Sequence, residues 1–199
     1  MRASQVPGSK RVAKPADGGR CAIHVCSLDR VWKTIERERP THLVTLLHND
    51  GILPTPAAIS TANHLRLSLH DISTPQPGMV HAGVEHVERI LTFVRAWDRR
   101  APMVVHCLAG ISRSTATAFM AACALNPRAP ERAIAESIRE LSPTASPNLL
   151  LVEIADRLLQ RDGRMIQAIE VIGRGEPAME GWPFALPATW PVCVRQATP

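Results

Sequence analysis

Short apolar runs alternate with longer stretches of helical periodicity along most of the chain. The runs at residues 22–26, 43–47 and 102–106 are mostly apolar, as expected of strands that are buried on both faces. Residues 65–69 instead alternate leucines with polar side chains, which is typical of a strand with one exposed face. The pattern therefore predicts four strands.

Helical periodicity fills most of the chain between and after these strands. Apolar residues recur every three or four positions over residues 28–35 and 84–97, and again in several stretches over residues 112–172. We expect Asp162 to cap the last of these helices and Gly173 to end it. Strands that alternate with helices predict an α/β protein with a mainly parallel sheet of four to five strands, flanked by helices. Ligands of such sheets bind at the carboxyl ends of the strands.

The composition changes at both ends of this pattern. Residues 1–20 mix Pro, Gly, Ser and basic side chains without periodicity, which predicts a disordered basic tail. Residues 174–199 alternate prolines and three aromatic residues with small residues, and form a Pro-rich C-terminal extension that either wraps the domain or extends away from it. A chain of 199 residues favours one domain, which we assign to residues 21–173.

The excess of basic charge lies in the N-terminal tail. The net charge is +5, but residues 1–20 hold five basic side chains and one acidic side chain, whereas the rest holds 18 basic and 17 acidic ones. The predicted domain therefore lacks the basic surface that nucleic-acid binding requires, and we expect no nucleic-acid partner.

The cysteines and the hydropathy pattern favour a cytoplasmic protein. Five cysteines without a Cys-x-x-Cys pair are typical of a reducing compartment. No apolar run reaches the roughly 18 residues of a membrane span, and the N-terminus lacks the apolar core of an export signal. The histidines, His81 and His86 included, show no metal-ligand spacing, so we expect no metal and no other cofactor. The sequence carries no signal for an oligomeric state.

The fourth predicted strand leads into the segment with the clearest chemistry. A short loop that contains Gly110 follows Cys107, and a helix is expected from about Ser112. Backbone N–H groups at a helix start, together with the helix dipole, bind anions. Arg113 in the first turn opposes the dipole unless an anion is bound beside it, and its guanidinium can grip two oxygens of a phosphate. The same groups favour the thiolate form of Cys107, so the loop predicts a phosphoryl-transfer site.

The order of residues around this cysteine resembles the signature of the cysteine-dependent protein tyrosine phosphatases. The matching positions are His106, Cys107, Gly110, Ser112, Arg113 and Ser114. The intervening Ala109 and Ile111 are most similar to the dual-specificity branch, as in a small, single-domain member of bacterial type. The resemblance implies the fold of these phosphatases. It also implies hydrolysis of phosphotyrosine, and of phosphoserine or phosphothreonine in a dual-specificity enzyme, through a cysteinyl-phosphate on a phosphorylated protein or peptide.

The resemblance assigns roles within the loop. Cys107 is the expected nucleophile, and Arg113 the expected phosphate ligand. Ser114 is implied to help the sulfur leave in the second step, although its hydroxyl could simply satisfy the backbone of the first helical turn. The phosphate is expected to bind the loop residues Leu108, Ala109, Gly110, Ile111, Ser112 and Arg113.

A leaving alkoxide or phenoxide also requires a proton donor. Members of the family carry an aspartic acid for this purpose some thirty-odd residues before the cysteine. Asp71 lies 36 positions upstream, at the end of a predicted strand, whereas Asp98 is too near and Asp50 too far. We therefore expect Asp71 to be the general acid; the alternative is that it only turns its own loop.

Two further residues are expected to support the loop. His106 is implied to orient the loop from beneath without transferring protons. Asn148, in the sequence Ser-Pro-Asn, resembles a family asparagine that braces the loop, but capping of the following helix explains it equally well.

Other functions stay open at this point. Phosphatases of inositides or inositol phosphates usually carry lysines where this chain has Leu108 and Ile111. A catalytically silent phosphate-binding module is possible in principle, although the expected catalytic residues are all present. A sulfur transferase of the rhodanese type also uses a strand, a cysteine loop and a helix, but the serines that flank Arg113 favour the phosphatase.

Overall fold

The computed structural model describes residues 21–49 and 53–190. The tail predicted at residues 1–20 lies outside the described residues, as does the end of the C-terminal extension, residues 191–199. Within the described ranges, no helix has both the length and the apolar character that crossing a membrane requires.

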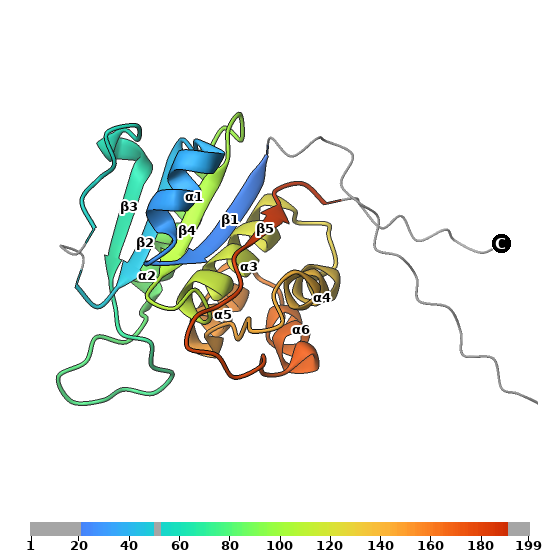
Figure 1. Ribbon diagram of the computed structural model, residues 1–199. Helices are drawn as coiled ribbons and strands as arrows, with labels where there is room; N and C mark the ends of the chain where they lie inside the picture. The colour runs from blue at the N-terminus through green and yellow to red at the C-terminus, as the bar shows by residue number, and fades with distance from the viewer. Residues whose placement is uncertain (1–20, 50–52, 191–199) are drawn as a thin grey trace, which may run out of the picture.

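Five strands form one sheet in the order β3-β2-β4-β1-β5 (Figure 1). The strands are β1 (Ala22–Ser27), β2 (His42–Leu47), β3 (His64–Ser68), β4 (Met103–Cys107) and β5 (Phe184–Pro187). The first four run parallel, and β5 joins β1 in the antiparallel direction at the edge of the sheet. These parallel pairs confirm the predicted α/β class with a mainly parallel sheet. As expected of such a sheet, β1, β2 and β4 are buried along their whole length.

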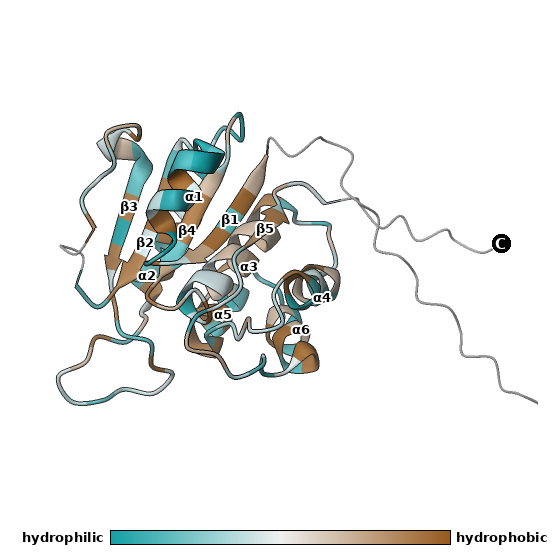
Figure 2. Ribbon diagram, in the orientation of Figure 1, coloured by the Kyte–Doolittle hydropathy of each residue, from teal (hydrophilic) through white to brown (hydrophobic). Residues whose placement is uncertain are grey.

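Helices cover both faces of the sheet (Figure 1). They are α1 (Val31–Glu38), α2 (Val84–Ala96), α3 (Arg113–Leu125), α4 (Glu131–Leu141), α5 (Leu149–Leu158) and α6 (Arg164–Ile172), with a short 3-10 turn at Thr61–Asn63. α1 packs on one face over a small core that includes Val31 and Val104, and the segment that carries Leu53 and Ile59 joins this core. The other helices build the large core on the opposite face. Apolar colour is concentrated on the strands, and the outer side of α1 is hydrophilic (Figure 2).

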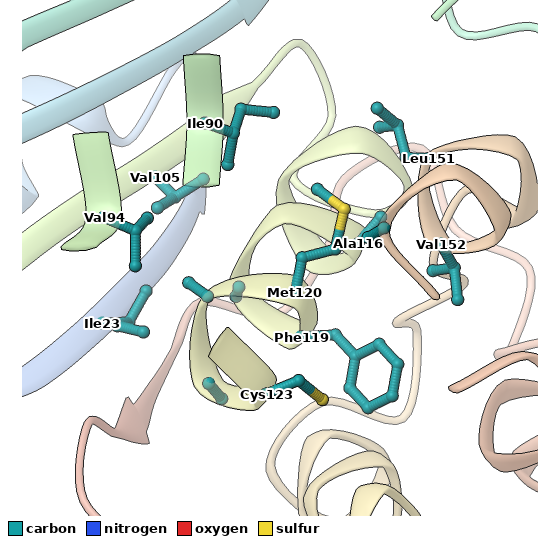
Figure 3. Close-up of a cluster of buried hydrophobic side chains, with 14 of the residues drawn as sticks. Ile23, Ile90, Val94, Val105, Ala116, Phe119, Met120, Cys123, Leu151 and Val152 are labelled. Atoms are coloured by element: carbon teal, nitrogen blue, oxygen red, sulfur yellow. The ribbon is translucent and has the colours of Figure 1, made fainter. Parts of the chain in front are cut away.

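α3 is the central helix of the large core. Every residue from Arg113 to Cys123 is buried, which is typical of a helix that is surrounded by other elements. Phe119 and Met120 fill the space between α3 and its neighbours, whereas alanines such as Ala116 let α5 approach closely (Figure 3). The start of this helix, which carries Arg113, is therefore held in a fixed position.

The C-terminal extension contributes a strand that the sequence does not predict. In β5, Phe184 and Leu186 are buried and Ala185 is exposed, so the segment alternates as an edge strand does. Pro187 is tolerated because only one side of an edge strand is paired. The described part of the extension therefore packs on the domain.

The predicted cap of the last helix is wrong. The carboxylate of Asp156, rather than that of Asp162, accepts hydrogen bonds from Gly163 N at 2.7 Å and from Met165 N at 2.9 Å. Gly163 occupies the N-cap position with φ of +82°, and this left-handed turn brings the helix start to the end of α5. The helix ends at Gly173 as expected.

Candidate active site

The carboxyl edge of the sheet brings together residues that are far apart in the sequence. β4 ends at Cys107, and α3 begins six residues later at Arg113. β3 lies two strands away in the same direction, and the chain reaches Asp71 just beyond its end. Parallel strands with a common edge therefore place the predicted acid, nucleophile and arginine on one side of the molecule.

The carbonyl groups of the loop after Cys107 are bonded to the surrounding protein. Four backbone N–H groups from outside the loop and α3 donate to them: Leu28 N to Leu108 O at 3.1 Å, Gly181 N to Ala109 O at 2.8 Å, Ser146 N to Ile111 O at 2.9 Å and Asn148 N to Ser112 O at 3.3 Å. Ser112 O also accepts from Ala116 N at 3.0 Å within α3. Because the C=O and N–H of a trans peptide point in opposite directions, outward carbonyls turn the loop N–H groups inward. The loop is thus a cradle of amides, which is a geometry that binds anions.

The sulfur of Cys107 lies within this cradle. Gly110 N–H donates to Cys107 Sγ at 3.3 Å, and Ser114 Oγ lies 3.2 Å from the same sulfur. Cys107 is 1% exposed. Gly110 adopts φ of +74°, and a Cβ there would lie 2.7 Å from Ser27 N, so the tight turn over the sulfur requires glycine.

Arg113 is buried with part of its hydrogen-bonding capacity unused. It is 5% exposed, and Nη1 donates to the Leu69 carbonyl at 2.8 Å. Nε has no hydrogen-bond partner and lies 3.7 Å from Asp71 Oδ2. A buried donor without a partner is costly, and a bound oxyanion would supply the acceptor.

The two oxygens of Asp71 have different surroundings. Ser112 Oγ donates to Oδ1 at 2.6 Å and Asn148 Nδ2 at 2.9 Å. The direction of the second bond is fixed, because Asn148 Oδ1 accepts from Leu151 N at 3.2 Å. Since Oδ1 accepts two hydrogen bonds, a proton on this carboxyl group belongs on Oδ2, the oxygen on the side of Arg113. Asn148 thus both caps α5 and anchors Asp71.

A buried polar chain lies beneath the loop. His106 Nε2 and His64 Nε2 each lie 2.8 Å from the hydroxyl oxygen of Thr45. Burial lowers the pKa of His106 to about 4, and burial, aided by Arg66, does the same for His64. Both rings are therefore neutral at pH 7, and His106 directly precedes Cys107 at the end of β4. No local sequence pattern selects Thr45 or His64, because their hydrogen bonds join three different strands.

The residues beside the cradle leave room for a substrate. A cavity of about 620 Å³ opens next to Asp71, Ser112 and Asn148 and extends to Arg174 at the end of α6. Leu108 is exposed on the loop. No group of three or more His, Cys, Asp or Glu residues in the described part of the chain is arranged to hold a metal ion.

The comparison with known proteins agrees with this geometry. Residues 70–142 match the family model of protein-tyrosine phosphatases, and this stretch contains Asp71, Cys107 and Arg113. No curated protein matches the chain. Residues 70–142 of this chain thus resemble the protein-tyrosine phosphatases.

Solved structures of phosphatases share the fold. The crystal structure of DUSP15 has a TM-score of 0.52 at 16% identity over 76% of this chain and 90% of that chain. A mouse putative dual specificity phosphatase, complexed with zinc tungstate, has a TM-score of 0.51 at 18% identity over 80% of this chain and 98% of that chain. The PTP-2 phosphatase of Cydia pomonella has a TM-score of 0.51 at 17% identity over 68% of this chain and 84% of that chain. The chain thus covers between 84% and 98% of these three chains, and at such identities the likeness establishes the fold alone.

Proposed function

We propose that the protein is a phosphomonoester hydrolase of the protein tyrosine phosphatase type that acts through a cysteinyl-phosphate. The observation that carries the proposal is the position of Cys107 Sγ inside the amide cradle, with Gly110 N at 3.3 Å and Ser114 Oγ at 3.2 Å. Arg113 and Asp71 lie at the rim of the same cradle. A nucleophile, an anion-binding loop and an acid in one place are the parts that this reaction needs.

In the first step, the inward N–H groups and Arg113 bind the three non-bridging oxygens of the phosphate. The thiolate of Cys107 attacks the phosphorus, and the bond from phosphorus to the leaving oxygen breaks. The proton on Asp71 Oδ2 passes to that oxygen, so an alcohol or phenol departs. The anchoring of Oδ1 by Ser112 and Asn148 holds the other oxygen in place for this transfer.

In the second step, the carboxylate of Asp71 takes a proton from a water molecule that attacks the phosphocysteine. The bond between sulfur and phosphorus breaks, inorganic phosphate forms, and the thiolate returns. Ser114 Oγ, 3.2 Å from the sulfur, supports this step because its hydroxyl can donate to the departing thiolate.

Phosphotyrosine in a protein or peptide is the proposed substrate. Cys107 lies at the bottom of the loop and is nearly inaccessible, and a long, flat side chain reaches such a floor more readily than a short one. Leu108 and Ile111 supply no positive charge for the several phosphates of an inositide. Inositol phosphates, and phosphoserine or phosphothreonine in a dual-specificity enzyme, are the alternatives that a substrate panel separates.

Hydrolysis of a chromogenic aryl phosphate tests the proposal. We expect turnover that vanadate blocks and that Cys107→Ser abolishes. The Asp71→Ala protein should trap phosphotyrosine peptides in preference to phosphoserine peptides and inositol phosphates. Wild-type protein that binds phosphate but does not hydrolyse any of these substrates would instead be a silent binding module.

A further inference from the structure

The chain between α6 and β5 lies against the outer side of the candidate phosphate loop. This stretch, residues 174–182, is named here the C-terminal connection; it contains no helix or strand (Figure 1). Gly181 N–H donates to Ala109 O at 2.8 Å, and Glu176 N–H donates to Pro143 O at 2.9 Å. The connection is therefore bonded both to the loop and to the segment that follows α4.

Gly181 and Gly110 are packed against each other without room for a side chain. A Cβ at position 181 would lie 2.5 Å from Gly110 O. A Cβ at position 110 would lie 2.7 Å from Ser27 N. The loop backbone is thus held between the end of β1 and the C-terminal connection, and it cannot move away from an atom that is added on the outer side.

Glu180 fastens the connection to the end of β1. Its Oε1 accepts from Ser27 Oγ at 2.6 Å and from Arg30 Nε at 2.7 Å. Hydrogen bonds from Arg30 and Ser27 lower the pKa of Glu180, so the carboxylate is ionised at neutral pH. Ser27 is paired in register with Cys107 on the adjacent strand. The anchor therefore lies beside the strand end that carries the sulfur.

The bond from Gly181 to Ala109 determines the direction of one amide of the cradle. Ala109 C=O and Gly110 N–H belong to the same peptide, and in a trans peptide these two groups point in opposite directions. Because the carbonyl is held outward by Gly181, the N–H is directed inward, where it lies 3.3 Å from Cys107 Sγ.

We propose that Glu180 and Gly181 are positioning residues of the phosphate loop. Gly181 holds the peptide between Ala109 and Gly110 with its N–H toward the sulfur, and Glu180 keeps Gly181 in place by its bonds to Ser27 and Arg30. Neither residue touches the substrate. Their importance for turnover depends on the proposed function, whereas their effect on oxyanion binding does not.

Binding of tungstate and hydrolysis of an aryl phosphate together test this proposal. In Gly181→Ala the added Cβ displaces the peptide of Gly110, and in Glu180→Ala the connection loses its anchor. We expect both variants to bind tungstate about 10- to 100-fold more weakly and to lose kcat by a similar factor, because a shift of about 1 Å in a catalytic group has effects of this size. Glu180→Gln retains an oxygen for Ser27 and Arg30, and it should recover most of the affinity.

Two control variants separate positioning from general destabilisation. Gly163→Ala places a side chain at φ of +82° with no atom within 4 Å, far from the loop, so it should lower the melting temperature without weakening tungstate binding. Met179 is 96% exposed next to Glu180, and Met179→Ala should change neither property. Wild-type tungstate affinity in both Gly181→Ala and Glu180→Ala would overturn the proposal. If these variants weaken tungstate binding but the wild-type protein hydrolyses no phosphoester, the positioning role stands and the proposed function fails.

Discussion

A buried arginine lies at each end of α3, and the two differ in how many protein acceptors they bond. At the carboxyl end, Arg161 donates to Glu131 Oε1 at 2.8 Å, to Cys123 O at 2.7 Å and to Pro127 O at 3.2 Å. At the amino end, Arg113 donates to one carbonyl, and its Nε is without a partner. Each arginine is 5% exposed, so burial does not distinguish them. The difference is that Arg113 keeps an unpaired N–H group that a ligand can bind.

The cysteines near the two ends differ in the same way. Cys123 faces the apolar core, and burial raises the pKa of its thiol. Cys107 is equally buried, but an amide N–H donates to its sulfur and Ser114 Oγ lies 3.2 Å from it. At the carboxyl end of α3, three protein oxygens thus accept from Arg161, as at a structural site. The other end is preorganised for an anion, which is typical of a catalytic site.

Replacing each cysteine by serine should give the largest contrast. Cys107→Ser should lower turnover of an aryl phosphate by more than about a thousandfold, because loss of a nucleophile removes the covalent route. Its melting temperature should change little. Cys123→Ser should retain turnover but lose about 1–3 kcal/mol of stability, because it buries a hydroxyl among apolar side chains. Steady-state kinetics and urea unfolding measure the two effects, and comparable turnover in the two variants would contradict the comparison.

Replacing each arginine by alanine should likewise affect stability at one end of α3 and ligand binding at the other. Arg161→Ala leaves the buried carboxylate of Glu131 with only the longer bond from Arg164, 3.2 Å, so we expect a loss of about 3 kcal/mol in the free energy of unfolding. Arg113→Ala removes a charge that is incompletely paired, so stability should change by less than about 1 kcal/mol, while binding of tungstate is lost. Urea unfolding and calorimetry distinguish the outcomes. A large stability loss in Arg113→Ala would mean that this residue is structural too.

Acidification should destabilise the folded protein through His106 and His64, the two buried histidines that bond Thr45. His106 and His64 both have pKa values of about 4 in the folded protein, below the unfolded value near 6.5. The unfolded chain therefore binds more protons between these values, and stability falls as pH is lowered through this window. For one such histidine the loss between pH 7.5 and pH 5 is about 2 kcal/mol.

The variant His64→Gln tests the source of this pH dependence. It removes one titrating ring but keeps a polar side chain toward Thr45, so the slope of unfolding free energy against pH should be shallower than in the wild type. A slope that does not change would assign the effect to other groups.

The sequence predicts the parts of the site that are local and misses those that depend on packing. The strand, loop and helix around Cys107 are contiguous, so their chemistry is readable from nine residues. Asp71 lies just beyond the end of another strand, β3, and could be selected only because the phosphatases that the chain resembles keep a regular distance to their acid. Glu180 and Gly181 reach the loop from a Pro-rich extension without periodicity, and no pattern connects them to Ala109. The strand β5 is missed for the same reason, because its pairing with β1 exists only in the folded chain.

Asn148 has both a structural role, as a helix cap, and a role at the candidate site, where it bonds Asp71. Two substitutions separate these roles, and their expected effects are the smallest. Its Oδ1 caps α5, while its Nδ2 anchors Asp71 Oδ1 at 2.9 Å. Asn148→Ser keeps a good capping group but cannot donate to Asp71 in the same geometry; Asn148→Ala loses both functions. We expect kcat to fall about tenfold in both variants, a modest part of what acid catalysis contributes. Only Asn148→Ala should also lose about 1 kcal/mol of stability. If the serine variant keeps wild-type turnover, Asn148 is a helix cap and no more, and the anchoring of Asp71 then depends on Ser112 alone.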